Sequence, residues 1–125
     1  EGTVCCVMDA RRNQVYNALF RAEGGSITRI REDRAISLEE LEADLKNLEK
    51  PKILVGDGAV LCYNTLRDRV GGLRLMPEAL RMQRASGVAL AAAEQAARGL
   101  RPSAGELVPN YLRLSQAERE RMNRN

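Results

Sequence analysis

The sequence predicts an α/β fold, in which an antiparallel three-strand meander is followed by helix crossovers in a mixed sheet with helices packed on it. Three segments rich in β-forming residues follow one another with only short turns between them, at 3–9, 15–22 and 26–31. Helical and strand patterns then alternate, which requires crossovers to further strands. At 125 residues the chain suits one domain with a real core.

The first three segments are predicted as consecutive strands. Residues 3–9 form a continuous apolar run, typical of a strand buried on both faces. The segment 15–22, VYNALFRA, is rich in β-forming residues, and 26–31 follows the turn at Gly24 and Gly25. Short turns between consecutive strands indicate an antiparallel meander.

A helix is predicted to begin after Ser37. Ser37 and Glu40 form the sequence pattern of a capping box. Four leucines recur at helical spacing and predict one buried stripe: Leu38, Leu41, Leu45 and Leu48. Pro51 ends the helix.

The rest of the chain alternates between strands and helices. Residues 52–59 form a short buried strand running into a glycine turn, and 60–70 continue as a helix. The side chains of this helix expected to face the core are Leu61, Leu66 and Val70. A short strand follows at 72–76, then a helix of small residues at 86–98, and a polar last helix from about Ser115. This order is that of the ribonuclease H-like, or actin-like ATPase, fold, which hosts many functions.

The positive charge of the chain is concentrated in its tail. The net charge is +3, and residues 1–97 hold 14 basic and 14 acidic side chains, whereas residues 98–125 hold six arginines against three glutamates. Such a tail suits contact with RNA or an acidic protein surface, and a solvated helix face is the alternative. With one Phe and no Trp, the chain offers no aromatic platform for stacking bases.

Composition also excludes many classes of enzyme. The chain has no histidine, which removes the commonest general base and the commonest zinc ligand. Its cysteines, Cys5, Cys6 and Cys62, form no CxxC and are interpreted as buried reduced thiols, which predicts a cytoplasmic protein. No apolar run approaches the ~20 residues needed to cross a bilayer. We therefore predict no catalytic residue, no metal site, no cofactor and no membrane contact.

Asp9, with two arginines behind it, allows two interpretations. It could be a catalytic carboxylate beside a phosphate clamp, or the start of a hairpin turn. A catalytic aspartate needs a partner acid, base or metal, and the spacing provides none, so the hairpin is favoured. Arg11 and Arg12 remain candidates for contact with a partner or with RNA phosphate.

Three motifs carry a resemblance to a known family. They are DARRNQVY (9–16), VGDGA (55–59) and a P-x-YLR segment (109–113) leading to AER (117–119). In this order and at these distances they resemble the C-terminal half of the TsaB family, the bacterial tRNA threonylcarbamoyladenosine biosynthesis subunits related to actin-like ATPases. The resemblance covers essentially the whole chain.

The resemblance implies a domain organisation. Residues 1–114 correspond to a ribonuclease H-like C-terminal lobe and 115–125 to a basic C-terminal helical tail. The family carries another, N-terminal lobe that this chain lacks, and the start at Glu1 is then expected to be a cut between lobes. A lone lobe should expose apolar surface on or near the helix 86–98, and self-association into a homo-oligomer is expected.

The resemblance also implies a function. It implies a non-catalytic scaffold subunit supporting TsaD, which transfers the threonylcarbamoyl group to the adenosine next to the anticodon of tRNA, with the small ATPase TsaE as a further partner and tRNA engaged indirectly. Two other classes stay open. One is an enzyme, either an actin-fold phosphotransferase or a peptidase, and the other is an RNA-binding module acting through the basic tail.

Comparison with TsaD bears on the glycine turn, which reads like GGVAAN in that family. Here Gly56, Asp57 and Gly58 resemble a degenerate remnant of a nucleotide-binding loop, since Asp57 stands where a second glycine would let the backbone approach the nucleotide. Gly56 and Gly58 are accordingly interpreted as turn-forming residues.

The segment after Pro109 supplies the remaining candidates. Candidate contacts for a partner or RNA are Tyr111, Arg113 and Arg119. Pro109 favours an extended backbone, so Tyr111 and Arg113 are expected to face outward, with the leucines between and after them anchored in the core.

Overall fold

The computed structural model describes residues 1–49, 51–114 and 121–122. The chain divides into two compact units, Glu1–Met82 and Gln83–Asn125. Its strands are β1 (Gly2–Asp9), β2 (Gln14–Glu23), β3 (Ser26–Ser37), β4 (Lys52–Val55) and β5 (Leu73–Leu75). Its helices, within the described residues, are α1 (Leu38–Lys46), α2 (Ala59–Leu66), α3 (Glu78–Arg81) and α4 (Ala85–Ala97).

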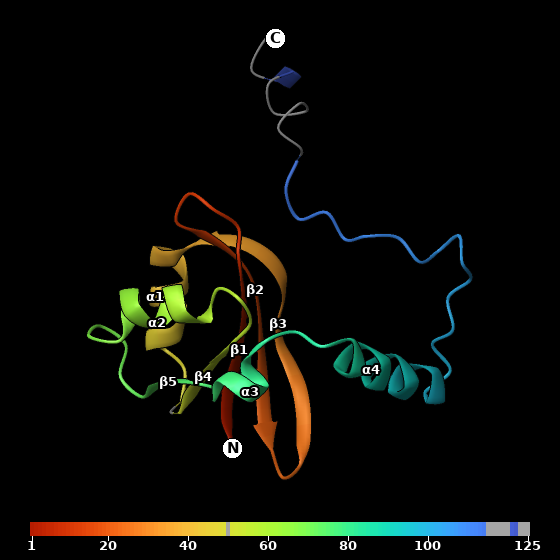
Figure 1. The fold of residues 1–125 in the computed structure, drawn as a ribbon, viewed down its shortest axis with the longest axis horizontal. Coiled ribbons are helices and arrows are strands. Elements are labelled where there is room, and N and C mark those ends of the chain that lie inside the picture. The colour runs from red at the N-terminus through yellow and green to blue at the C-terminus, as the bar shows by residue number, and fades with distance from the viewer. Residues whose placement is uncertain (50, 115–120, 123–125) are drawn as a thin grey trace. The chain divides into compact units, whose positions relative to one another are not determined.

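The first unit is built on a mixed five-stranded sheet with the order β3-β2-β1-β4-β5 (Figure 1). The pairs β1–β2 and β2–β3 are antiparallel, whereas β1–β4 and β4–β5 are parallel. The predicted α/β class, with a meander followed by helix crossovers, is confirmed. The apolar run 3–9 forms the central strand β1, but its expected burial on both faces is met on one face only: Cys5 and Val7 are buried, whereas Met8 is 46% exposed.

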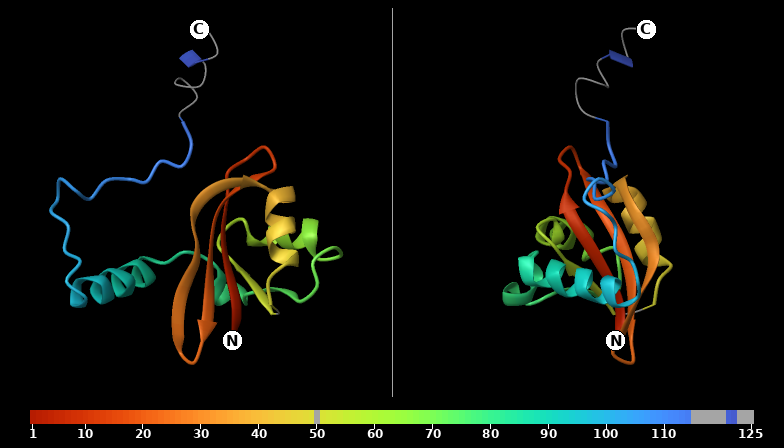
Figure 2. Two further views of the ribbon diagram at one scale, coloured as in Figure 1. Left: turned by 180° about the vertical axis from the view of Figure 1, so that it is seen from behind. Right: turned by 90° about the vertical axis from the view of Figure 1, so that its right-hand side faces the viewer.

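Helices α1 and α2 share one hydrophobic core with one face of the sheet. The core cluster includes Cys5, Val7, Val15, Leu19, Leu41, Leu45, Leu54, Cys62 and Leu66. Of the predicted leucine stripe, Leu38, Leu41 and Leu45 are buried and Leu48 is half-buried against the cluster. Figure 2 shows the two helices from two further sides.

The start and the flank of α1 are fixed by polar contacts. The predicted capping box is present: the Glu40 N–H donates to Ser37 Oγ at 3.1 Å, and the Ser37 N–H donates to Glu40 Oε2 at 2.8 Å. Glu42, further along α1, pairs with Lys46 Nζ at 2.7 Å and with Arg69 Nη1 at 2.9 Å. The second pair ties α1 to the turn that follows α2.

Three local expectations were wrong. β3 extends to Ser37 rather than ending at residue 31, because β2 pairs with its polar second half. Leu61 was expected to face the core, but it is 38% exposed. Helix α2 begins at Ala59, and the side of the helix that faces the sheet carries Cys62 instead. The short helix α3 follows Pro77, where no element was expected.

Asn17 is a buried polar residue at the middle of the sheet. Its Nδ2 donates to the Cys6 carbonyl oxygen at 3.0 Å and lies 3.4 Å from Cys5 Sγ. Its Oδ1 accepts two hydrogen bonds from the Arg34 guanidinium, at 3.1 and 3.0 Å. Arg34 also lies 2.6 Å from Asp44 Oδ2, so a single chain of contacts joins β1, β2, β3 and α1. The contact with Asp44 is an ion pair without a directed hydrogen bond.

The second unit contains the predicted helix of small residues, α4. None of its residues is buried, and its larger apolar side chains, Val88 and Leu90, are 69% and 72% exposed. The basic helical tail predicted for 115–125 falls almost wholly outside the described residues. In the part of the chain that the structure describes, no helix has the length and apolar character to cross a membrane.

Replacing Leu45 by alanine should lower the free energy of unfolding by about 2–5 kcal/mol, because Leu45 is fully buried between α1 and the sheet. Leu80→Ala, at a 62% exposed position of α3, is the matched control and should change it by less than about 0.5 kcal/mol. Urea denaturation of both variants measures the difference. Equal losses would mean that the leucine stripe is not the core of the unit.

Candidate functional site

The connection from β1 to β2 is a hairpin, as favoured from the sequence. The Ala10 N–H donates to the Gln14 carbonyl oxygen at 3.0 Å, and the Gln14 N–H donates to the Arg11 carbonyl oxygen at 3.1 Å. Arg11, Arg12 and Asn13 all have positive φ, at 64°, 56° and 57°. Left-handed backbone is costly for residues other than glycine, and asparagine tolerates it best. The hairpin therefore holds two arginines in an uncommon conformation.

The glycine turn between β4 and α2 lies directly against the end of β1. Gly56 has φ +100°, and a Cβ added to it would lie 2.1 Å from the Val7 carbonyl oxygen. The Gly58 N–H donates to the same Val7 oxygen at 3.2 Å, and the Gly56 N–H donates to the Arg81 carbonyl oxygen at 2.7 Å. Glycine is required at position 56 because any side chain would collide with β1.

Two aspartates join the glycine turn to the hairpin. Asp57 Oδ1 accepts from the Asp9 N–H at 3.0 Å, and Asp9 Oδ1 accepts from the Arg11 N–H at 2.7 Å. The Arg11 guanidinium lies 3.9 Å from Asp9 Oδ2, at a largely exposed position. Both carboxylates thus fix local backbone. The sequence showed each aspartate after a strand, and the parallel pairing of β1 with β4 is what brings the two together.

The backbone of this site is engaged in hydrogen bonds within the chain. The turn's N–H groups at Gly56 and Gly58 already have acceptors in the chain itself. Within residues 1–49, 51–114 and 121–122 no cluster of three or more His, Cys, Asp or Glu side chains could hold a metal ion. The arrangement suits a rigid turn with an arginine-bearing hairpin beside it. The interpretation of Gly56, Asp57 and Gly58 as a degenerate nucleotide loop stays a prediction.

The other candidate residues belong to the second unit. Tyr111 is 84% exposed, and Arg113 is half-buried. The expectation that the leucines anchor this segment in the core was wrong, because Leu112 is only half-buried and Leu114 is 49% exposed. The alternation assumed for the segment belongs to a paired strand, and residues 107–114 are not part of one. Arg119 lies outside the described residues.

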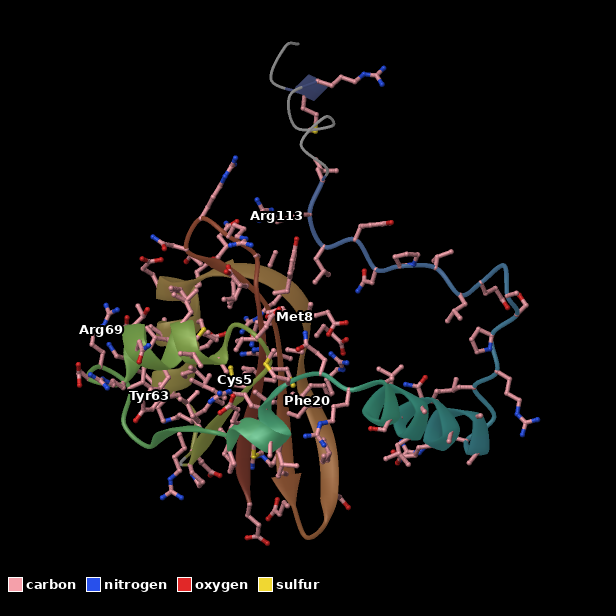
Figure 3. The ribbon with its side chains drawn as sticks, in the orientation of Figure 1. Cys5, Met8, Phe20, Tyr63, Arg69 and Arg113 are labelled. Atoms are coloured by element: carbon pink, nitrogen blue, oxygen red, sulfur yellow. The ribbon has the colours of Figure 1, made fainter. Side chains whose placement is uncertain are left out.

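The three cysteines are free thiols. Cys5, which is labelled in Figure 3, and Cys62 are fully buried. Cys6, on the other face of β1, is half-buried. Burial raises the pKa of the Cys62 thiol to about 12 and raises the pKa of Cys5 further. The thiolate is the reactive form of cysteine, so these two side chains are suited to the core and not to nucleophilic chemistry.

The sequence is similar to that of a curated bacterial protein. The chain is 29% identical over 119 residues to the tRNA threonylcarbamoyladenosine biosynthesis protein TsaB of Bacillus subtilis (strain 168), and the match covers 94% of this chain and 50% of that protein. The chain thus spans about half the length of this relative. No protein-family model matches. The resemblance to the TsaB family that the motifs indicated is confirmed.

Two solved structures from Pseudomonas aeruginosa have a similar fold. One is described as an uncharacterized protein with similarity to peptidase YEAZ, at 18% identity and a TM-score of 0.60, with 90% of this chain and 50% of that chain covered. The other is YeaZ, at 18% identity and a TM-score of 0.55, with 89% and 50% covered. At this identity the likeness shows the fold alone, and it agrees with the ribonuclease H-like lobe predicted from the order of the elements.

Gly56→Ala should lower the free energy of unfolding by more than about 2 kcal/mol, since the added Cβ would collide with the Val7 oxygen and φ is positive there. The same change at Gly87 in α4, where an added Cβ would meet no side chain and no other segment within 4 Å, should raise helix stability by about 0.5–1 kcal/mol. Urea titration followed by circular dichroism should therefore show a loss of stability for Gly56→Ala and a gain for Gly87→Ala. A neutral Gly56→Ala would show that the turn can move off β1.

The buried thiols predict a loss of stability at alkaline pH. In the unfolded chain a thiol ionises near pH 8.5, whereas Cys62 in the folded chain keeps its proton to about pH 12. Above the unfolded pKa the unfolded state loses a proton that the folded state retains, so the free energy of unfolding falls as pH rises through this window. Urea titrations from neutral to alkaline pH should show a shallower fall for Cys62→Ala than for the wild type. Parallel slopes would contradict the assignment.

Proposed function

We propose that this chain, whose sequence resembles the TsaB family and whose fold is similar to about half of YeaZ, is a non-catalytic scaffold subunit in threonylcarbamoyladenosine biosynthesis. In this role it supports a TsaD-type subunit during transfer of the threonylcarbamoyl group to the adenosine next to the anticodon of tRNA. A TsaE-type ATPase is the further partner, the tRNA is engaged indirectly, and the location is the cytoplasm.

One observation carries the proposal. The match to the Bacillus subtilis protein runs through 94% of this chain, so it includes the hairpin, the glycine turn and the segment around Tyr111 together. A match confined to the sheet would reflect the fold alone, and one fold hosts many functions. Because the chain spans 50% of that protein, the proposal concerns the contribution of this part to the whole.

The chemistry of the glycine turn supports a role without catalysis. A nucleotide-binding turn presents free backbone N–H groups to phosphate. Here the Gly58 N–H is bonded to Val7, and the Asp57 carboxylate, which would repel a phosphate, is held in the turn by the Asp9 N–H. The sequence also has no histidine to act as a general base.

A second function, peptidase activity, is favoured by a single observation. One solved relative in fold is described by its similarity to peptidase YEAZ. The buried and protonated thiols argue against a cysteine nucleophile, and the chain lacks the histidine that would activate a serine. The scaffold is therefore the better supported function.

Genetic complementation tests the proposal. A Bacillus subtilis strain depleted of TsaB would receive this chain alone, or this chain fused to the part of TsaB outside the alignment. Restored threonylcarbamoyladenosine in total tRNA, measured by mass spectrometry, is expected for the fusion. A folded fusion that restores none would refute the scaffold role. Calorimetry showing micromolar binding of ATP with magnesium would favour the enzyme instead.

The exposed aromatic Tyr111 is the candidate contact that the structure presents most openly. Tyr111→Ala in the fusion should weaken binding to the TsaD-type subunit about tenfold, as loss of an aromatic anchor at an interface does, and lower tRNA modification with it. The melting temperature should change little because the side chain is 84% exposed. Tyr111→Phe keeps the ring and serves as the control. Unchanged binding by Tyr111→Ala would exclude the residue from the interface.

A further inference from the structure

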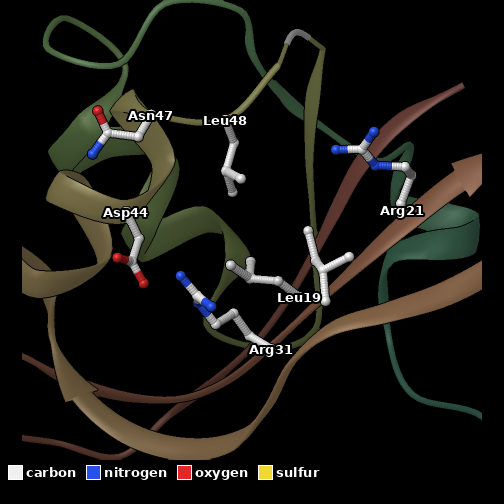
Figure 4. A pocket seen from close by; sticks show the side chains of 7 residues that line it. Leu19, Arg21, Arg31, Asp44, Asn47 and Leu48 are labelled. Carbon is white, nitrogen blue, oxygen red and sulfur yellow. The ribbon is translucent and has the colours of Figure 1, made fainter.

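A pocket of about 320 Å³ lies in the first unit, where β2 and β3 face the carboxyl end of α1 (Figure 4). Its apolar lining comes from Leu19, Ile30 and Leu48, all of which contact or belong to the core cluster. Arg21 and Arg31 enter from the strands. The volume is at the lower end of the roughly 300–1,000 Å³ that small-molecule sites occupy.

The pairing of β2 with β3 is irregular at this pocket. Leu19 pairs with Arg31 and Phe20 with Arg29, so Ile30 is an extra residue in β3 without a residue opposite it. In a regular strand, neighbours such as Ile30 and Arg31 point to opposite faces. Here both line one pocket, and bulges are known to redirect side chains in this way and to occur beside functional sites.

The charges around the pocket do not balance. Arg31 has no acidic side chain within 4.0 Å in the described part of the chain. The nearby carboxylates are engaged by other arginines, Asp44 by Arg34 at 2.6 Å and Glu49 by Arg21 at 3.7 Å. The second distance exceeds that of a hydrogen bond, so the donors of Arg21 also stay available. Three guanidinium groups against two carboxylates leave an excess of one positive charge.

We propose that this pocket binds a carboxylate carried on a short branched aliphatic group, supplied either by a free acid or by the last residue of a peptide. The Arg31 guanidinium binds the carboxylate, and Arg21 adds positive charge to the pocket lining. The aliphatic group contacts Ile30 and Leu48. A single excess charge matches a monoanion. A bare phosphate would leave the apolar lining without a partner, so the lining favours a ligand with its own apolar body.

This inference does not rest on the proposed function, because none of the residues that line the pocket belongs to the glycine turn or to the segment around Tyr111. Its test is direct titration of the ¹⁵N-labelled chain followed by NMR. The probes are 3-methylbutanoate for the free acid, N-acetyl-leucine for a peptide end, and the uncharged 3-methylbutanamide. Saturable shifts at residues 30, 31 and 48 are expected at millimolar concentration for at least one acid. The amide should bind about tenfold more weakly, the difference a charge-assisted hydrogen bond makes.

Two arginines of the same strand provide a matched pair of variants. Arg31→Gln should weaken acid binding about tenfold, and its melting temperature should stay near that of the wild type because Arg31 has no ion-pair partner among the described residues. Arg29→Gln removes a charge that is engaged with Asp33 at 2.7 Å and stacked on Phe20, and it should leave binding unchanged.

The ligand series keeps the proposal testable even if a variant is unstable. Binding of N-acetyl-leucine without 3-methylbutanoate would identify a peptide end as the ligand, and the reverse would identify a free acid. Equal binding of the amide and the acids, shifts that do not saturate, or equal loss in Arg29→Gln and Arg31→Gln would each overturn it.

Discussion

The close approach of the glycine turn to the end of β1 is the constraint on which the first unit depends. A chain that leaves β4 must turn at once into α2, and it does so with Gly56 pressed against the Val7 carbonyl oxygen. Gly58 donates to the same oxygen, so one acceptor at the end of the central strand fixes both the turn and the start of the helix. The face of α2 that carries Cys62 and Leu66 enters the core only because that helix starts where it does.

Local sequence patterns, not this constraint, account for most of what could be predicted from the sequence. The existence of the strands, the capped helix α1 and the glycine turn follows from local patterns, because β-type composition, helical spacing and turn chemistry act over a few residues. The expected burial of β1 on both faces was met on one face only, because no helix of the described residues covers the side chains of Val4, Cys6 and Met8 completely. The phase of α2 was not predictable in the same way. Whether Leu61 or Cys62 faces the core depends on the residue at which α2 begins. The contact of the glycine turn with β1 determines that residue.

The candidate site was harder to predict than the fold. The hairpin could be predicted from Asp9 and Asn13, but the hydrogen bond from the Asp9 N–H to Asp57 Oδ1 joins residues 48 positions apart and follows from strand order. The pocket was missed altogether, since the charged run from Thr28 to Arg34 has no two-residue alternation to show which face each side chain takes. An interrupted alternation in an otherwise strand-like segment is the sequence signal that could have indicated a bulge there.

The buried amide of Asn17 has a consequence for how faithfully the meander assembles. Strand pairing that relies on apolar contacts alone tolerates sliding by two residues, because such a slide keeps the same faces together. Here a slide of β3 would carry Arg34 away from Asn17 Oδ1 and leave a buried oxygen without its donors, at a cost of about 1–3 kcal/mol. The Asn17 amide thus fixes the register between β2 and β3. A sheet in which β3 pairs out of register is therefore less stable, even though β3 itself is largely polar and solvent-exposed.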